Sequence, residues 1–300
     1  MVFKFPKQVK SDLIGYETLV RLYYSFFSQN LAFSKLTLDF CQTTFFDANL
    51  CAVLGAILSK VSENNNTVTF INLHSSIDNI FTRNHFLSNF GGQILPDYNS
   101  TTIKFRKFEV VEDKQFNTYL DEELLIQQDL PQMTLKLRKE ISKSIFEIFS
   151  NADIHGKSKY VFCCGQYYPR LKKLDFTIVD LGKTIRSNVS RYLDYPAISG
   201  VDAIKWAIEE GNTTKTGDIP GGLGLSLIRK FINFNQGDLH IISSNGYLSE
   251  KDGYVFATDL VSEDNIDMRF GGTIVNLQFN INDKKSYQLS SEQIDPDDIF

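Results

Sequence analysis

Apolar and polar positions follow helical and strand periodicities in two successive stretches of the chain. In the first stretch, amphipathic or apolar segments predict helices at Asp12–Gln29, Asn49–Val61 and Ile77–Asn89. Short runs rich in β-branched and apolar residues predict strands at Leu36–Phe40, Thr67–Leu73 and Thr101–Phe105. Since strands alternate with helices, we expect a small α/β domain over residues 1–111.

A polar segment separates the two stretches. Residues 112–132 are rich in Asp, Glu and Gln, and Pro131 disfavours a helical conformation in the residue before it. Phe116, Leu120 and Leu124 recur every four residues, so part of the segment fits a connecting helix. We therefore interpret residues 112–132 as a linker.

The second stretch, residues 133–282, predicts a larger α/β domain. Its helical segments are Met133–Ala152, Val201–Glu210 and Leu223–Phe234, with a glycine-containing loop at 211–222. Its strand segments are Tyr160–Gln166, Leu174–Asp180, Asp238–Ser243, Gly253–Thr258 and Gly272–Asn280. We expect residues 283–300 to form a polar, acidic and mobile tail.

Composition narrows the classes of function. The chain of 300 residues has a formal net charge of -5, which argues against sequence-independent binding of nucleic acid. Its longest apolar run, Leu50–Leu58, is about half as long as a membrane-spanning helix. The four cysteines form no CxxC pair, which favours reduced thiols over disulfides or a zinc ribbon. We predict a cytoplasmic protein that binds neither nucleic acid nor a membrane.

Three polar residues share one face of the first long helix in the second domain. Glu147, Asn151 and His155 are spaced four apart, and Gly156 follows. An Asn oxygen can ligate Mg²⁺, which in proteins is held by a few side-chain oxygens together with phosphates and water. A Glu carboxylate can accept a proton. The alternative is an ordinary helix end, with Gly156 just past the last turn and His155 near the negative end of the dipole.

A carboxylate ends the second predicted strand of this domain. Asp180 follows an apolar run and precedes Leu181 and Gly182. Such a carboxylate can accept a hydrogen bond from an exocyclic amine like that of adenine, and a glycine lets a ligand approach the backbone. The alternative is a turn without a ligand at the end of a strand.

A glycine-rich segment leads into the last predicted helix. Gly222, Leu223 and Gly224 stand at the start of that helix, where backbone N–H groups favour an anion such as phosphate. Thr214 and Lys215 lie upstream and offer a hydroxyl and a cation. The segment matches neither the P-loop nor the GxGxxG pattern, and a flexible loop before a core helix is the alternative.

The order and spacing of these three motifs resemble the GHKL family of ATPases. Its Bergerat fold is shared by histidine kinases, gyrase B subunits, MutL proteins, heat-shock chaperones and anti-sigma-factor kinases. The form Glu147-x-x-x-Asn151-Ala-x-x-His155-Gly156 is most similar to the anti-sigma-factor kinase branch. The resemblance covers residues 133–282 and implies a Bergerat-fold α/β sandwich that binds ATP and Mg²⁺.

The resemblance also implies roles for individual residues. Glu147 is expected to be the catalytic general base and Asn151 the Mg²⁺ ligand, with His155 beside them. Asp180 is expected to bind the adenine amine, with Gly182 next to the ring. The remaining residues with an implied role in holding the nucleotide are Thr214, Lys215, Gly222, Leu223 and Gly224. Thr184 stands where the family often has a second glycine.

The first domain is similar to STAS domains, the anti-anti-sigma fold. The similarity lies in the strand at Leu36–Phe40 and in the run that ends Asp47-Ala48-Asn49 before an apolar helix. In STAS domains a phosphorylated serine tends to follow the aspartate. Because Ala48 and Asn49 stand in that region, the resemblance implies a scaffold or docking surface in place of a phosphoacceptor. An unrelated small α/β domain is the alternative.

We therefore expect an ATP-binding regulatory protein of bacterial signalling. It would hydrolyse Mg-ATP or transfer the γ-phosphoryl group to a protein partner, either STAS-like or another regulatory protein. The alternative is a switch that binds ATP and changes its affinity for a partner without hydrolysis. The sequence leaves open whether the protein is a monomer or a homodimer.

Overall fold

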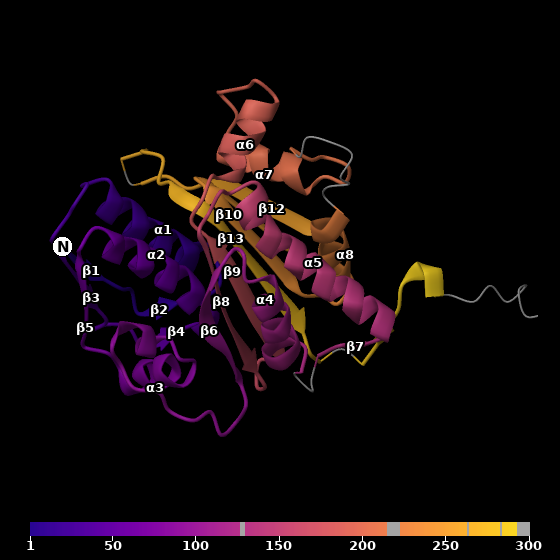
Figure 1. The fold of residues 1–300 in the computed structure, drawn as a ribbon, viewed down its shortest axis with the longest axis horizontal. Helices are drawn as coiled ribbons and strands as arrows, with labels where there is room; N and C mark the ends of the chain where they lie inside the picture. Colours follow the sequence, from indigo (N-terminus) through magenta and orange to yellow (C-terminus); the bar gives the residue numbers. More distant parts are fainter. Residues whose placement is uncertain (127–129, 215–222, 263, 283, 293–300) are drawn as a thin grey trace, which may run out of the picture.

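The two larger sheets and two layers of helices alternate through the described part of the molecule. The computed structural model describes residues 1–126, 130–214, 223–262, 264–282 and 284–292. A three-stranded sheet lies outermost, followed by a helical layer, a seven-stranded sheet and a second helical layer (Figure 1). This mixture of helices and strands confirms the predicted α/β class.

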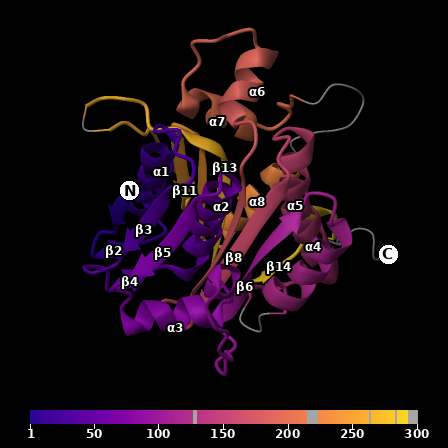
Figure 2. The same cartoon turned by 60° about the vertical axis from the view of Figure 1, so that its left-hand side comes forward.

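The first layers are built from the N-terminal third of the chain. Their strands are β1 (Val2–Lys4), β2 (Gln8–Val9), β3 (Lys35–Asp39), β4 (Phe45–Phe46) and β5 (Thr67–Ile71). Their helices are α1 (Leu13–Phe27), α2 (Cys51–Glu63) and α3 (Ser75–Arg83). β1, β3 and β5 form a parallel sheet, and α1 and α2 lie between it and the larger sheet (Figure 2). These elements confirm the predicted helices and the first two predicted strands of this region.

The strand expected to complete the first sheet belongs to the second one. Residues Thr102–Glu109 form β6, which runs antiparallel to β8 (Tyr160–Tyr168) at one edge of the seven-stranded sheet. The assignment of Thr101–Phe105 to the first domain is therefore wrong. An alternation of apolar and polar residues predicts a strand, but it does not determine which other strand it pairs with. The two sheets accordingly do not divide at the expected linker, residues 112–132.

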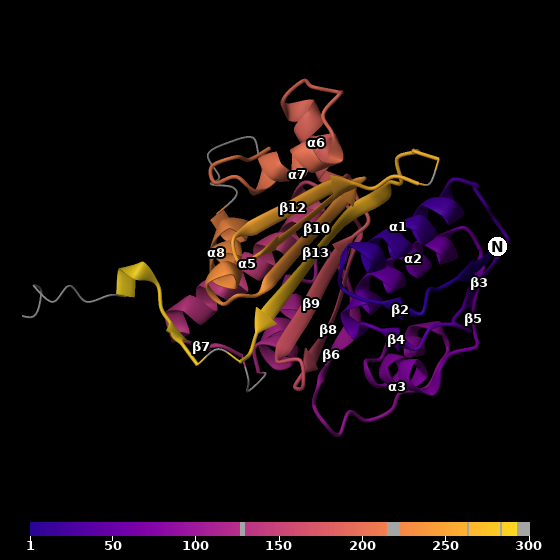
Figure 3. The same ribbon diagram turned by 180° about the vertical axis from the view of Figure 1, so that it is seen from behind.

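The seven-stranded sheet is antiparallel throughout, in the order β12-β11-β10-β13-β9-β8-β6 (Figure 3). Its remaining strands are β9 (Lys173–Asp180), β10 (Asp238–Ser244), β11 (Gly246–Lys251), β12 (Tyr254–Asp259) and β13 (Phe270–Asn280). Strand β11 was missed because its sequence, which includes Gly246 and Ser249, lacks a clear apolar alternation. A two-residue turn with positive φ at Asp252 and Gly253 joins β11 to β12, the geometry that suits a tight hairpin.

The second helical layer covers the other face of this sheet. Its helices are α4 (Asp113–Tyr119), α5 (Leu135–Ile154), α6 (Ile185–Tyr192), α7 (Gly200–Ile208) and α8 (Leu223–Phe234). The stripe Leu137, Ile141, Ile145 and Phe149 buries α5 against the sheet, as its periodicity predicts. Beside the start of α5, β7 (Gln132–Met133) pairs with β14 (Ser286–Tyr287). No helix in the described part of the chain is long and apolar enough to cross a membrane.

The expected linker contributes to the core. Phe116, Leu120 and Leu124, which recur every four residues, are buried in α4 and the helical turn that continues it. Phe116 stacks on Phe149 of α5 with ring centroids 4.2 Å apart. The predicted connecting helix is therefore confirmed, and it packs under the sheet as part of the second helical layer.

A buried polar contact fixes the first helical layer on the large sheet. Asn49 is fully buried, and its side-chain amide lies within hydrogen-bond distance of three oxygens. These are Ser11 Oγ at 2.8 Å, Thr177 Oγ1 at 2.9 Å and Asn276 Oδ1 at 3.0 Å. The neighbouring Asp47 carboxylate accepts a hydrogen bond from the hydroxyl of Tyr168 at 2.8 Å. The segment Asp47–Asn49 therefore docks on the chain's own sheet.

Replacing Asn49 tests how much this contact stabilises the fold. We expect Asn49→Ala to lower the free energy of unfolding by roughly 1–3 kcal/mol, because buried oxygens lose their donor. Urea denaturation measures the change. Asn99→Ala, at an exposed loop position, is the matched control and should change the free energy of unfolding little. Equal stability of the two variants would contradict the prediction.

Candidate functional site

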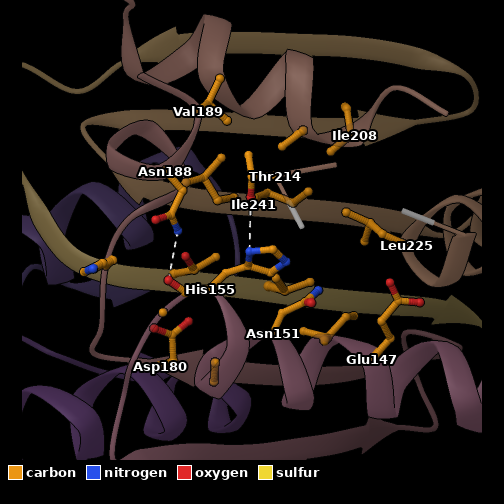
Figure 4. A pocket seen from close by; sticks show the side chains of 18 of the residues that line it. Glu147, Asn151, His155, Asp180, Asn188, Val189, Ile208, Thr214, Leu225 and Ile241 are labelled. Atoms are coloured by element: carbon orange, nitrogen blue, oxygen red, sulfur yellow. Dashed lines mark hydrogen bonds between the residues drawn. The ribbon is translucent and has the colours of Figure 1, made fainter. Parts of the chain in front are cut away.

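A cavity of about 150 Å³ lies between α5 and the end of the large sheet, beneath α6 and α7 (Figure 4). Its walls come from α5, the ends of β9 and β13, α6, α7 and the start of α8. Five of the polar residues expected from the sequence line it: Glu147, Asn151, His155, Asp180 and Thr214. The structure therefore brings together side chains from three separate motifs.

Helix α5 presents three of these residues along one face. The Thr134 hydroxyl caps its start by accepting a hydrogen bond from the Leu137 N–H at 3.2 Å, and the helix ends at Ile154. Glu147, Asn151 and His155 point from α5 into the cavity (Figure 4). The Oδ1 atom of Asn151 is buried and has no hydrogen-bond partner among the described residues. A buried polar atom without a partner is costly, and a ligand in the cavity would satisfy it.

His155 connects the end of α5 with two other segments. Its Nδ1 lies 3.1 Å from the Thr214 hydroxyl. Its backbone carbonyl accepts a hydrogen bond from the Asn188 side chain of α6 at 3.0 Å. His155 therefore contacts both the segment that follows α7 and helix α6. These two contacts lie at the mouth of the cavity.

Asp180 lies at the end of the cavity opposite Glu147 (Figure 4). Its Oδ1 accepts a hydrogen bond from the Gly182 N–H at 2.9 Å, and the Thr273 N–H also donates to this carboxylate. Burial raises the pKa of Asp180 to about 7, and the two N–H groups only partly offset that effect. The surroundings of this carboxyl group therefore favour its protonated form.

Gly182 supports the site without lining the cavity. A Cβ atom at this position would overlap with the backbone of Gly156, just beyond the end of α5. The Lys183 N–H donates to the carbonyl of Gly156 at 2.5 Å, which holds the two turns together. Thr184, where a second glycine was expected, caps α6 by accepting a hydrogen bond from the Ser187 N–H at 3.1 Å. Its φ of -74° requires no glycine.

The glycine-rich motif is only partly described. Lys215 and Gly222, which the resemblance associates with the phosphates, lie outside the described residues. Leu223 and Gly224 form the start of α8, and Leu225 in its first turn lines the cavity. The first turn of α8 therefore contributes Leu225 to the same cavity as α5 and Asp180.

The sequence did not single out several residues of the cavity wall. Thr273 lies opposite Asp180 in the register of β13 and β9, and Asn188 and Trp206 come from α6 and α7. The predicted strand Gly272–Asn280 includes Thr273, but only the pairing of strands shows which residue faces Asp180. α6 was missed because its sequence is largely polar.

The chemistry of the walls fits a flat, partly polar ligand and one metal ion. Apolar side chains from the sheet, among them Ile178, Ile241 and Val275, line the same cavity as Asp180. No cluster of three or more His, Cys, Asp or Glu residues suited to a metal occurs in the described part of the chain. The single amide oxygen of Asn151 fits Mg²⁺, which needs few protein ligands when phosphates and water supply the others.

The raised pKa of Asp180 predicts a pH-dependent stability. The folded state favours the protonated carboxyl, so this contribution is complete below the unfolded pKa of 3.8 and is lost as pH rises through about 7. Relative to Asp180→Asn, the wild type should lose roughly 2–4 kcal/mol of unfolding free energy between about pH 4 and pH 8.

Urea denaturation of both proteins across this pH range measures the difference. Burial also raises the pKa values of Asp175 and Asp238 to about 6, but these groups are common to both proteins and cancel. A constant difference between the two proteins at all pH values would contradict the prediction.

No protein-family model matches the chain, and no curated protein matches its sequence. The function must therefore be inferred from the motifs and from the geometry of the cavity.

Proposed function

We propose that this chain is a GHKL-type enzyme that binds Mg-ATP in the cavity and transfers the γ-phosphoryl group to water or to a hydroxyl of a protein partner. One observation carries the proposal. Residues from three motifs in the order typical of this family line one cavity, and the Asn151 oxygen, which has no hydrogen-bond partner among the described residues, lies between Asp180 and Glu147.

The Asp180 end of the cavity suits adenine. Apolar walls can enclose the faces of a base, and the Asp180 carboxyl can accept a hydrogen bond from the exocyclic amine. Binding to that amine favours the ionised carboxylate, so the ligand lowers the raised pKa of Asp180. The hydrogen bond from the Gly182 N–H keeps the carboxyl group oriented before the base arrives.

The opposite end suits the phosphates. Asn151 lies four residues, or about 6 Å along the helix axis, from both His155 and Glu147. Asn151 would hold Mg²⁺, and the bound ion would offset the negative charge of the phosphates. The N-terminal end of α8 supplies backbone N–H groups to the same region. These local contacts are required because the protein as a whole carries a net charge of -5.

Glu147 is suited to activate the attacking hydroxyl. Its carboxylate accepts the proton as the oxygen of water or of a serine or threonine bonds to the γ-phosphorus and the bond to the β-phosphate oxygen breaks. The acceptor cannot come from the STAS-like motif of the same chain. Ala48 is 1% exposed and lies against the opposite face of the large sheet, where it packs next to Cys164.

Replacing Asn151 tests the proposed binding of Mg-ATP. We expect Asn151→Ala to abolish Mg²⁺-dependent binding of ATP, because the cavity loses its buried oxygen ligand. Titration calorimetry with and without Mg²⁺ measures this. Ser150→Ala is the matched control, since the Ser150 hydroxyl bonds to the Phe146 carbonyl of its own helix. Binding of Mg-ATP by Asn151→Ala at the wild-type affinity would contradict the assignment.

Replacing Glu147 separates an enzyme from a binding switch. We expect Glu147→Gln to retain ATP binding and to lose roughly 10²–10⁴-fold in phosphate release or phosphoryl transfer, because the base is missing. Glu140→Gln, two helical turns earlier on α5, should keep the wild-type rate. If Glu147→Gln and the wild type showed the same ATP-dependent binding of a partner and no turnover, the switch would be favoured.

A further inference from the structure

The two edges of the seven-stranded sheet differ in how their backbone is protected. At one edge, β6 carries Lys104, Arg106 and Lys107, charges that oppose pairing with another strand. Its backbone is also satisfied from outside the sheet. The Phe105 N–H donates to the Asn84 carbonyl at 2.7 Å, and the Lys104 carbonyl accepts from the Tyr119 hydroxyl at 2.7 Å. These charges and contacts therefore oppose a further strand at this edge.

At the other edge, β12 is open. Among the described residues it pairs only with β11, and its six residues contain no proline, lysine or arginine. Tyr254, Val255 and Phe256 are 82%, 45% and 53% exposed. An exposed apolar edge strand of this kind is a template for a further strand.

The hairpin register determines which backbone groups face outward. Lys251 and Tyr254 close a two-residue turn, so Tyr254 and Phe256 direct their N–H and C=O groups towards β11. The N–H and C=O groups of Val255 and Ala257 therefore point to the open edge. The N–H and C=O groups of a partner strand must therefore pair with those of every second residue of β12.

We propose that a second copy of this chain pairs with β12, strand against strand, about a two-fold axis. Antiparallel pairing of identical strands is self-complementary, so the contact closes after two copies. In the alternative, β12 of one copy pairs with β6 of the next copy, and the assembly grows without closing. The charges and hydrogen bonds at the β6 edge oppose this arrangement. The seven strands of each copy would form one continuous sheet.

The geometry also points to a register. Val255 of one copy exchanges two hydrogen bonds with Ala257 of the other, and the two Phe256 residues stand directly opposite each other. This is the closely spaced type of pair, in which apolar and aromatic side chains gain most from contact. A strand of six residues buries less area than a standard interface, so we expect self-association in the micromolar range.

The test uses the full chain. Sedimentation velocity from roughly 1 to 100 μM should show a reversible dimer of the wild type. Phe256→Lys places two like charges opposite each other and should weaken self-association at least about tenfold. Phe33→Lys is the control, because Phe33 is 84% exposed and lies in the first layers, before β3. A monomer at all concentrations, or equal association of both variants, would overturn the proposal.

Crosslinking tests the register by a second route. In a Cys41→Ser background, which removes the exposed native thiol, Phe256→Cys should form an intermolecular disulfide under mild oxidation. Val255→Cys, whose two sulfurs are offset by two residues, should crosslink much more slowly. Equal rates for the two cysteines would overturn the strand pairing. Neither experiment depends on ATP, so failure here and failure of the proposed function are distinguishable.

Discussion

The pairing of β9 with β13 at the centre of the large sheet is the constraint on which both halves of the molecule depend. Its register places Asp180 opposite Thr273 on the face of the cavity and Thr177 opposite Asn276 on the other face. Because both faces are covered, a slip of one residue would exchange the two sets of side chains. It would place the polar groups that bind Asn49 under α5 and remove Asp180 from the cavity.

The three-stranded sheet and its helices therefore cover one face of the seven-stranded sheet, a face that could not be exposed to water. The strands at its centre are buried on both sides, and α1, α2 and the segment Asp47–Asn49 supply one of the two covers. The buried amide of Asn49 contributes to specificity as well as stability, since only one placement of this layer satisfies its partners. A position that the STAS resemblance associates with phosphorylation is thus part of an internal interface.

Local periodicity predicted features that depend on a single helix or strand. It could not predict which strands pair with each other. The four-residue spacing of Glu147, Asn151 and His155 identified one face of α5, and the cavity lies on that face. The partner of β6 could not be predicted, because alternation is the same whichever sheet a strand joins. Thr273 was missed for the same reason. Its contact with Asp180 exists only through the register of two strands that are far apart in sequence.

The direct contact between the Gly182 and Gly156 backbones joins the turn that carries Asp180 to the end of α5. The nearest atoms that a Cβ at Gly182 would meet are all backbone atoms of Gly156. A movement of the turn that carries Asp180 must therefore shift the last turn of α5, and with it His155 and its hydrogen bonds to Thr214 and Asn188. In this fold, the position of the Asp180 carboxyl group and the arrangement of the cavity mouth are therefore coupled through the main chain at Gly182 and Gly156.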